Sequence, residues 1–228
     1  MRIKRLFPLL FILFLSPAIP CAFAQTQSSP AQETLSALLL RIEENLGTVT
    51  SLKTRFIQEK HLSFFTDPVE TRGFCLFQAP DRIRFETTEP YRSVLIAQGK
   101  AVGKFETVAG RWEKIQPGNT DGILMVIGQI RSWLKGRFRE AENIYRIEAV
   151  TTPYAVITLT PKDPRFKQML RSIEIGLNPS ETGLQYIRLN QGAKDFTRII
   201  FRDDRINTSL PPDLFNPDRL PPLPVESW

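Results

Sequence analysis

The chain has few side chains of the kinds that carry out covalent chemistry. His61 is the only histidine among the 228 residues, and the two cysteines are Cys21 and Cys75. A Ser-His-Asp arrangement would have His61 as its single base, and no G-x-S-x-G turn is present to hold a nucleophile. So few histidines and cysteines do not make a zinc site either. We therefore expect no enzyme, no catalytic residue, no metal site and no cofactor.

The other reactive groups also have simple structural explanations. Solvated faces account for the acidic residues that have no acid-base spacing: Glu43, Glu44, Asp203, Asp204 and Asp213. No glycine-rich phosphate loop occurs. Cys75 lies between Phe74 and Leu76 in a β-like run, where we expect a buried, unreactive thiol. If the protein were an enzyme, His61 would be the only base to test.

The start of the chain has the features of a secretory signal. Three basic residues lie within the first five positions, an apolar run follows at residues 6–15, and small residues precede a cleavage point after Ala24. This run is too short to span a membrane stably, and no later run reaches that length. We expect residues 1–24 to be removed and the rest of the chain to be soluble and exported. The alternative is lipidation at Cys21, which the preceding Pro20 disfavours.

The charge of the chain is mildly basic. The formal net charge is +6, and three of the positive charges belong to the signal. This is too little to indicate a nucleic-acid partner. One basic cluster either ends a helix in solvent or contacts anionic lipid or a partner protein: Arg131, Lys135, Arg137 and Arg139. A second basic group either is simply solvated or rims the open edge of the sheet: Arg82, Arg84 and Arg92.

The first element after the signal is predicted to be a helix. Ser29 suits the N-cap, Pro30 the first helical position and Gln32 the capping box, and Gly47 is placed to end the helix. Apolar residues recur at helical spacing: Leu35, Leu38, Leu39, Ile42 and Leu46. This helix is therefore amphipathic.

Most of the remaining chain has β character. Short runs of β-branched and aromatic residues alternate with Pro or Gly and predict about ten antiparallel strands. Ile83 and Phe85 alternate with charged neighbours, so their strand has one apolar face. Residues 177–183 predict a hairpin turn. The Pro-rich residues 211–228 are expected to be loose or to lie extended over the surface.

Residues 122–137 interrupt the β pattern with an apolar block that predicts a second helix. Its apolar face consists of Ile123, Ile127, Ile130 and Leu134. Asp121 suits the start of the helix, and Gly128 costs about 1 kcal/mol relative to Ala, which favours a bend. Met125 and Trp133 make the segment adaptable.

The fold class is therefore mainly β with α, with helices against one face of a curved sheet. Such a sheet encloses more volume than two helices fill. Its inner wall then borders either a packed core or a cavity for a ligand, with wall residues such as Phe56, Ile83, Phe85 and Ile96. For any single residue of this wall, a packed core is the simpler interpretation.

Several motifs together resemble the LolA family, periplasmic carriers of outer-membrane lipoproteins in Gram-negative bacteria. The motifs are "SLKTRFIQEK" with Phe56 and Gln58, "GFCLFQAPDRIRFE" with Gly73, Pro80 and Phe85, then Pro90, "LIAQGK", "ITLTPKD" and "LPPDLFNP". Each motif is weak alone, but their order and spacing cover nearly the whole chain after the signal.

The resemblance implies an incomplete, open antiparallel β-barrel whose concave apolar face is closed by helices acting as a lid. It implies a carrier domain at residues 25–210, followed by the tail at 211–228. The implied partners are a lipoprotein or other acylated amphiphile, an inner-membrane release complex and an outer-membrane acceptor. A monomer in the periplasm, without nucleic acid, is expected.

The expected site has two parts. The lipid-binding cavity is expected to contain Phe56, Phe74, Leu76, Ile83, Phe85, Val94 and Ile96. The lid is expected to contain Leu35, Leu38, Leu39, Ile42, Leu124, Met125, Ile127 and Trp133. Ala79 stands where family members have an Arg that helps to hold the lid, so a latch of that type is in doubt. The alternatives are a carrier of a glycolipid or polyene-type lipid, and an anchored outer-membrane acceptor.

Overall fold

The computed structural model describes residues 34–116 and 120–220. The chain divides into two compact units, and the described residues all belong to the second, residues 33–228. The expected signal and the expected N-cap at Ser29 lie outside the described residues. Among those described, no helix has the length and apolar character needed to cross a membrane.

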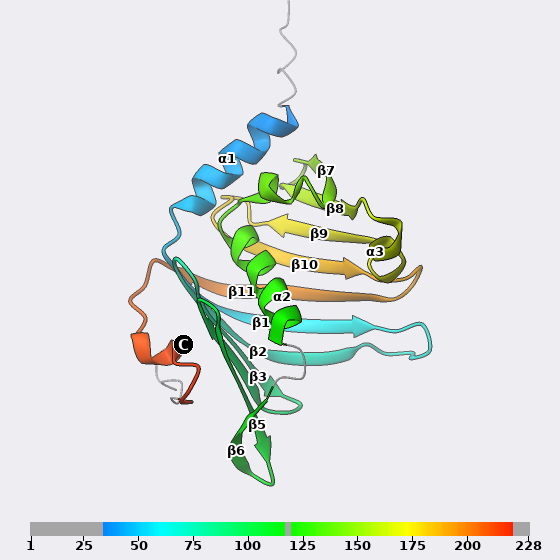
Figure 1. The fold of residues 1–228 in the computed structure, drawn as a ribbon. Helices are drawn as coiled ribbons and strands as arrows, with labels where there is room; N and C mark the ends of the chain where they lie inside the picture. The colour runs from blue at the N-terminus through cyan, green and yellow to red at the C-terminus, as the bar shows by residue number, and fades with distance from the viewer. Residues whose placement is uncertain (1–33, 117–119, 221–228) are drawn as a thin grey trace, which may run out of the picture. The chain divides into compact units, whose positions relative to one another are not determined.

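One antiparallel sheet of eleven strands forms the body of this unit (Figure 1). The strands are β1 Ser51–His61, β2 Val69–Gln78, β3 Arg82–Glu89, β4 Ser93–Gln98, β5 Ala101–Val108, β6 Arg111–Ile115, β7 Tyr145–Val150, β8 Val156–Pro161, β9 Ser172–Leu177, β10 Leu184–Asn190 and β11 Phe196–Ile206. The two edge strands, β6 and β7, are not paired with each other, so the sheet is open. The predicted fold class is confirmed, with one strand more than expected.

The last strand, β11, lies near the centre of the sheet and joins its N-terminal and C-terminal halves. β11 returns to pair with β1, and Phe56 lies opposite Phe201 in that pair. The other neighbouring strands follow one another along the chain as hairpins. Gly99, at φ +58°, makes the β4–β5 turn, because a residue without Cβ adopts this conformation at little cost. The predicted hairpin turn at residues 177–183 joins β9 to β10.

Helix α1, Leu35–Gly47, has Thr34 as its N-cap, and the Thr34 hydroxyl accepts from Ala37 N at 3.3 Å. The described helix therefore begins five residues after the expected start. Its apolar stripe is buried in the main core: Leu38, Leu39, Ile42 and Leu46. The amphipathic pattern correctly identifies the buried stripe of this helix.

Helix α2, Thr120–Leu134, is the predicted second helix, and it lies across one face of the sheet (Figure 1). A 3₁₀ turn, η1 Phe138–Ala141, follows it. The short helix α3, Pro164–Met169, was not predicted. It has Asp163 as N-cap, accepting from Arg165 N at 2.7 Å, and proline in its first turn, a combination that favours a helix start.

The C-terminal segment packs against the sheet instead of lying loose. A 3₁₀ turn, η2 Pro212–Phe215, buries Leu214 and Phe215 against β3 and β4. This corrects the expectation for residues 211–220, because two apolar side chains among the prolines bind the segment to the sheet. Residues 221–228 lie outside the described part of the chain.

Candidate functional site

Different elements cover the two faces of the sheet, which we call the inner face and the outer face. The inner face carries Ile83 and Phe85 and is covered by α2, whose Ile127 belongs to the same apolar cluster. The outer face carries Leu76 and is covered by the C-terminal segment. Cross-strand pairing fixes these assignments, since paired residues project to the same side of a sheet.

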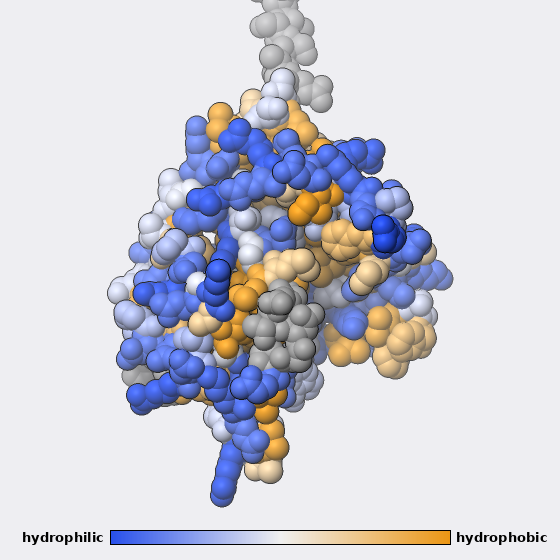
Figure 2. All heavy atoms as spheres, viewed as in Figure 1, coloured by the Kyte–Doolittle hydropathy of each residue, from blue (hydrophilic) through white to orange (hydrophobic). Residues whose placement is uncertain are grey.

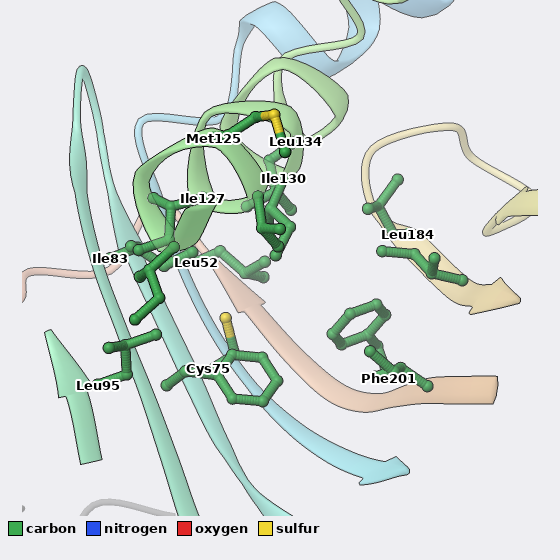
Figure 3. Close-up of a pocket in the computed structure, with 15 residues that line it drawn as sticks. Leu52, Cys75, Ile83, Leu95, Met125, Ile127, Ile130, Leu134, Leu184 and Phe201 are labelled. Carbon is green, nitrogen blue, oxygen red and sulfur yellow. The ribbon is translucent and has the colours of Figure 1, made fainter. Parts of the chain in front are cut away.

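A cavity of about 580 Å³ lies between α2 and the inner face (Figure 3). This volume is within the range of about 300–1,000 Å³ typical of ligand sites. Every lining residue is apolar: Leu52, Cys75, Ile83, Phe85, Leu95, Ile123, Met125, Val126, Ile127, Ile130, Leu134, Leu184, Ile187, Ile199 and Phe201. The site therefore offers no charged or amide group to bind a polar ligand, and it suits hydrocarbon.

The floor of the cavity is built on an aromatic pair. The ring of Phe56 stacks on that of Phe85, with centroids 4.2 Å apart and planes 26° apart. The Phe56 ring occupies the space above Gly73, where a Cβ would lie 2.8 Å from its Cζ. A side chain at position 73 would also overlap the carbonyl of Glu86. The glycine in the motif thus permits both the ring position and the close β2–β3 approach.

Cys75 contributes a thiol to the cavity wall. Burial, with a smaller contribution from Asp204, raises the pKa of this thiol to about 12. The thiol is therefore protonated near neutral pH and acts as a small apolar group. Among the described residues, no group of three or more His, Cys, Asp or Glu is placed to hold a metal ion.

Two basic residues attach α2 to the rest of the unit. Lys135 Nζ donates to Val49 O at 2.6 Å and to Gly47 O at 3.4 Å. Arg131 Nη1 donates to Gly99 O, in the β4–β5 turn, at 3.4 Å. These contacts connect the end of α2 to the end of α1 and to the sheet.

The position of α2 also leaves polar atoms unpaired. Among the described residues, no partner accepts from Arg131 Nε, Arg131 Nη2 or Trp133 Nε1, or donates to Gln129 Oε1. Burial lowers the pKa of Arg131, and Asp81 opposes this effect. A buried polar group without a partner costs about 1–3 kcal/mol. The observed position of α2 is therefore less stable than its apolar contacts alone indicate.

Of the expected cavity residues, the structure brings three together on the inner face. Ile83 and Phe85 line the cavity, and Phe56 lies beneath Phe85. Leu76, Val94 and Ile96 do not line this cavity, because they pack under the C-terminal segment on the outer face. Phe74 pairs with Glu86 and projects to the same outer face as Leu76. It therefore lies neither in the cavity nor in its floor.

The expected lid residues also divide into two groups. Met125 and Ile127 line the cavity, whereas Leu124 does not. Trp133 and the α1 residues Leu38, Leu39 and Ile42 are buried in the main core, and Leu35 is exposed. The cavity is therefore covered by α2, and no residue of α1 lines it.

The basic groups considered from the sequence have separate roles. Arg84 is buried with Glu86, 2.7 Å from its carboxylate, and also donates to Leu214 O at 3.3 Å, so it does not rim the sheet. Arg139 pairs with Glu43 at 2.9 Å. His61 stacks on Phe196 at 4.1 Å and is not part of the cavity lining.

The fold is an open antiparallel sheet with an apolar cavity beneath a helix. The sequence matches the family described as "Outer membrane lipoprotein carrier protein LolA" over residues 47–218, and the chain belongs to this family. The LolA family is a carrier family. Among curated protein sequences, none matches this chain.

Solved structures with a similar fold have little sequence identity to this chain. A DUF1329 family protein from Desulfovibrio piger is 8% identical, with a TM-score of 0.47 and coverage of 78% of this chain and 94% of that one. A chain of the MucA/MucB complex of Pseudomonas aeruginosa is 13% identical, with a TM-score of 0.46, and the match spans 79% of this chain and 60% of that one. A LolA superfamily protein from Nitrosomonas europaea is 12% identical, with a TM-score of 0.42 and coverage of 82% and 99%.

Proposed function

We propose that the protein is a periplasmic carrier that binds the acyl chains of lipoproteins in the cavity beneath α2 and moves them from the inner to the outer membrane. The observation that carries this proposal is the cavity of about 580 Å³ with an entirely apolar lining. The family membership supports it. Cleavage after Ala24 would release the carrier domain into the periplasm, with an inner-membrane release complex as donor and an outer-membrane protein as acceptor.

Release of cargo requires that the cavity not bind too tightly. Removing a CH₂ group from water contributes about 0.8 kcal/mol, so a chain of about sixteen carbons contributes on the order of 13 kcal/mol. Ile127 and Ile130 of α2 line the cavity together with the sheet residues, so α2 and cargo contact the same apolar wall. Competition between α2 and cargo for the same surface reduces the net affinity to a value that permits transfer.

Lipid extraction from the purified exported protein tests this proposal. We expect a lipoprotein or its acyl chains to co-purify, and a fluorescent fatty acid to bind and to be displaced by lipopeptide. A glycolipid or polyene-type lipid in the extract would assign another cargo to the same cavity. A protein that is always empty and does not bind the fatty acid would exclude the carrier function.

The mass of the exported protein separates a free carrier from an anchored acceptor. A mature chain that begins at Gln25 supports a carrier, whereas an acylated chain that begins at Cys21 supports an anchored protein. His61→Ala tests the enzyme alternative. We expect this variant to transport normally, because His61 does not line the cavity.

A further inference from the structure

The strand connections at one end of the sheet present apolar side chains to solvent. We define the loop end as residues 60–69, 162–171 and 191–195, which include the β1–β2 and β10–β11 connections and α3. Figure 1 places all three on the side of the sheet away from α1. Phe64 is 74% exposed and Phe65 54%, and Met169 on α3 is 75% exposed. Figure 2 shows apolar atoms gathered at the end of the β1–β2 hairpin, with hydrophilic residues over α3 above them.

These loops are held together by hydrogen bonds. Ser63 N donates to Asp195 Oδ1 at 2.6 Å, which joins the β1–β2 connection to the β10–β11 connection. Phe65 N donates to Leu62 O at 2.9 Å, and the Phe64 and Phe65 ring centroids are 4.6 Å apart. The loop end is therefore preformed, and binding through the two rings requires little further ordering.

The charge of the loop end is positive. It contains six basic residues, Lys60, Lys162, Arg165, Lys167, Arg171 and Lys194, and three acidic residues, Asp67, Asp163 and Asp195. Asp163 and Asp195 already accept backbone N–H groups. Within the described residues, none of the six basic side chains forms an ion pair. Their charge is available to an anionic partner.

We propose that the loop end docks on an anionic bilayer surface, with Phe64 and Phe65 inserted among the lipids and the basic residues of the loop end near the headgroup phosphates. Apolar rings beside Lys and Arg are typical of surfaces that lie at the membrane interface. The two rings project from a hairpin end, and a fluid interface accepts a projecting group without a matching pocket. The charge complementarity favours anionic lipid over a neutral surface.

This inference rests on the proposed function, because docking would bring the cavity close to the membrane that supplies or receives cargo. Strands β1, β10 and β11 connect the two sites. They carry the wall residues Leu52, Ile187 and Ile199 and end at the loop end. Contact at the loop end would shorten the distance that an acyl chain travels through water.

Vesicle flotation of the purified exported protein tests the proposal. One set of vesicles contains phosphatidylethanolamine and phosphatidylglycerol, and the other contains phosphatidylcholine alone. We expect binding to the anionic vesicles to exceed binding to the neutral vesicles. F64S/F65S should reduce binding to the anionic vesicles by about tenfold or more, because two apolar rings are lost. K167E/K194E should reduce it by about tenfold or more and remove its salt dependence.

Matched variants control for general effects. I144S/V150S removes two exposed apolar side chains elsewhere, and K100E reverses an exposed charge in the β4–β5 turn. Both should bind vesicles as the parent does. Equal loss in the control and loop-end variants would overturn the proposal, as would absence of vesicle binding by the parent protein. Acyl-probe binding, measured in parallel, should be unchanged in F64S/F65S. Vesicle binding without acyl-probe binding would overturn the carrier function but not the docking surface.

Discussion

The ring of Phe85 stacks on the ring of Phe56 with centroids 4.2 Å apart, and both rings belong to one apolar cluster on the inner face of the sheet. Phe85 faces the cavity, whereas Phe56 is only 2% exposed. A substitution at Phe85 therefore changes the surface that cargo meets, with less effect on the core than a substitution at Phe56. Variants on the inner and outer faces of the sheet can therefore be compared to distinguish effects on cargo binding from effects on stability.

Phe85→Gln should weaken binding of a fluorescent fatty acid by about tenfold or more, because a buried amide without a partner costs about 1–3 kcal/mol. Phe74→Gln is the matched control. Both rings are partly buried on neighbouring strands, but Phe74 does not line the cavity. We expect similar losses of stability in urea and normal probe binding only in the Phe74 variant. Equal probe affinities in the two variants would contradict the assignment of the cavity.

Replacement of Lys135 by Met should loosen α2. The variant loses the 2.6 Å hydrogen bond to Val49 O, and a bond from a charged group contributes about 1.5–3 kcal/mol. Stopped-flow measurement of fatty-acid release should show a rate increase of about tenfold. An unchanged release rate would show that this contact does not restrain the helix.

Replacement of Arg131 by Met should have the opposite effect. The guanidinium has one long hydrogen bond, to Gly99 O, and two buried nitrogens without a partner among the described residues. An apolar side chain of similar length removes the cost of burying them. We expect slower release of the fatty acid and equal or greater stability. Faster release would show that Arg131 is a latch and that its charge is compensated in solution.

Part of this architecture follows directly from sequence patterns. The alternation in β3 correctly places Ile83 and Phe85 on one face, because strict period-two alternation fixes the direction of each side chain. The run Val94–Leu95–Ile96 in β4 has no alternation. Only its pairing shows that Leu95, opposite Phe85, is the cavity residue. A continuous apolar run is buried on both faces here, since the C-terminal segment covers one and the cavity the other.

The sequence pattern does not predict the cavity wall on the C-terminal half of the sheet. Leu184 and Ile187 both line the cavity, although their spacing is odd. An irregularity in the β9–β10 pairing between Leu184 and Tyr186 shifts the alternation. Ile199 and Phe201 belong to the continuous apolar run Ile199–Ile200–Phe201 in β11, so the sequence pattern does not show which of its faces lines the cavity.

The C-terminal segment should be necessary for stability of the sheet. Phe215 is fully buried on the outer face, in contact with the cluster that includes Val94 and Ile96. Phe215→Ala should lower the free energy of unfolding by about 3–5 kcal/mol, as expected for a large side chain removed from a core. Phe65→Ala, at an exposed position, should change it by about 0.5 kcal/mol or less. Similar unfolding midpoints for both variants would contradict the packing of this segment.

The thiol of Cys75 should report on access to the cavity. Its pKa of about 12 leaves a thiolate fraction of about one in ten thousand at pH 8, so alkylation by iodoacetamide should be slower than for a free thiol by about a thousandfold. The alkylation rate should rise with pH up to about 12, and bound fatty acid should lower it further. The exposed single thiol of Cys75→Ser/Thr66→Cys is the control, with a rate that levels off near pH 9.

The same pKa predicts a contribution of Cys75 to the pH dependence of stability. Because folding raises the pKa, the folded state favours the neutral thiol. This contribution is fully present below the unfolded pKa of about 8.5 and is lost as the pH rises toward about 12. Urea titrations at several pH values should show a steeper alkaline loss of stability for the parent than for Cys75→Ala. Parallel curves for the two proteins would show that the thiol is not desolvated, and the cavity would then be open to water without movement of α2.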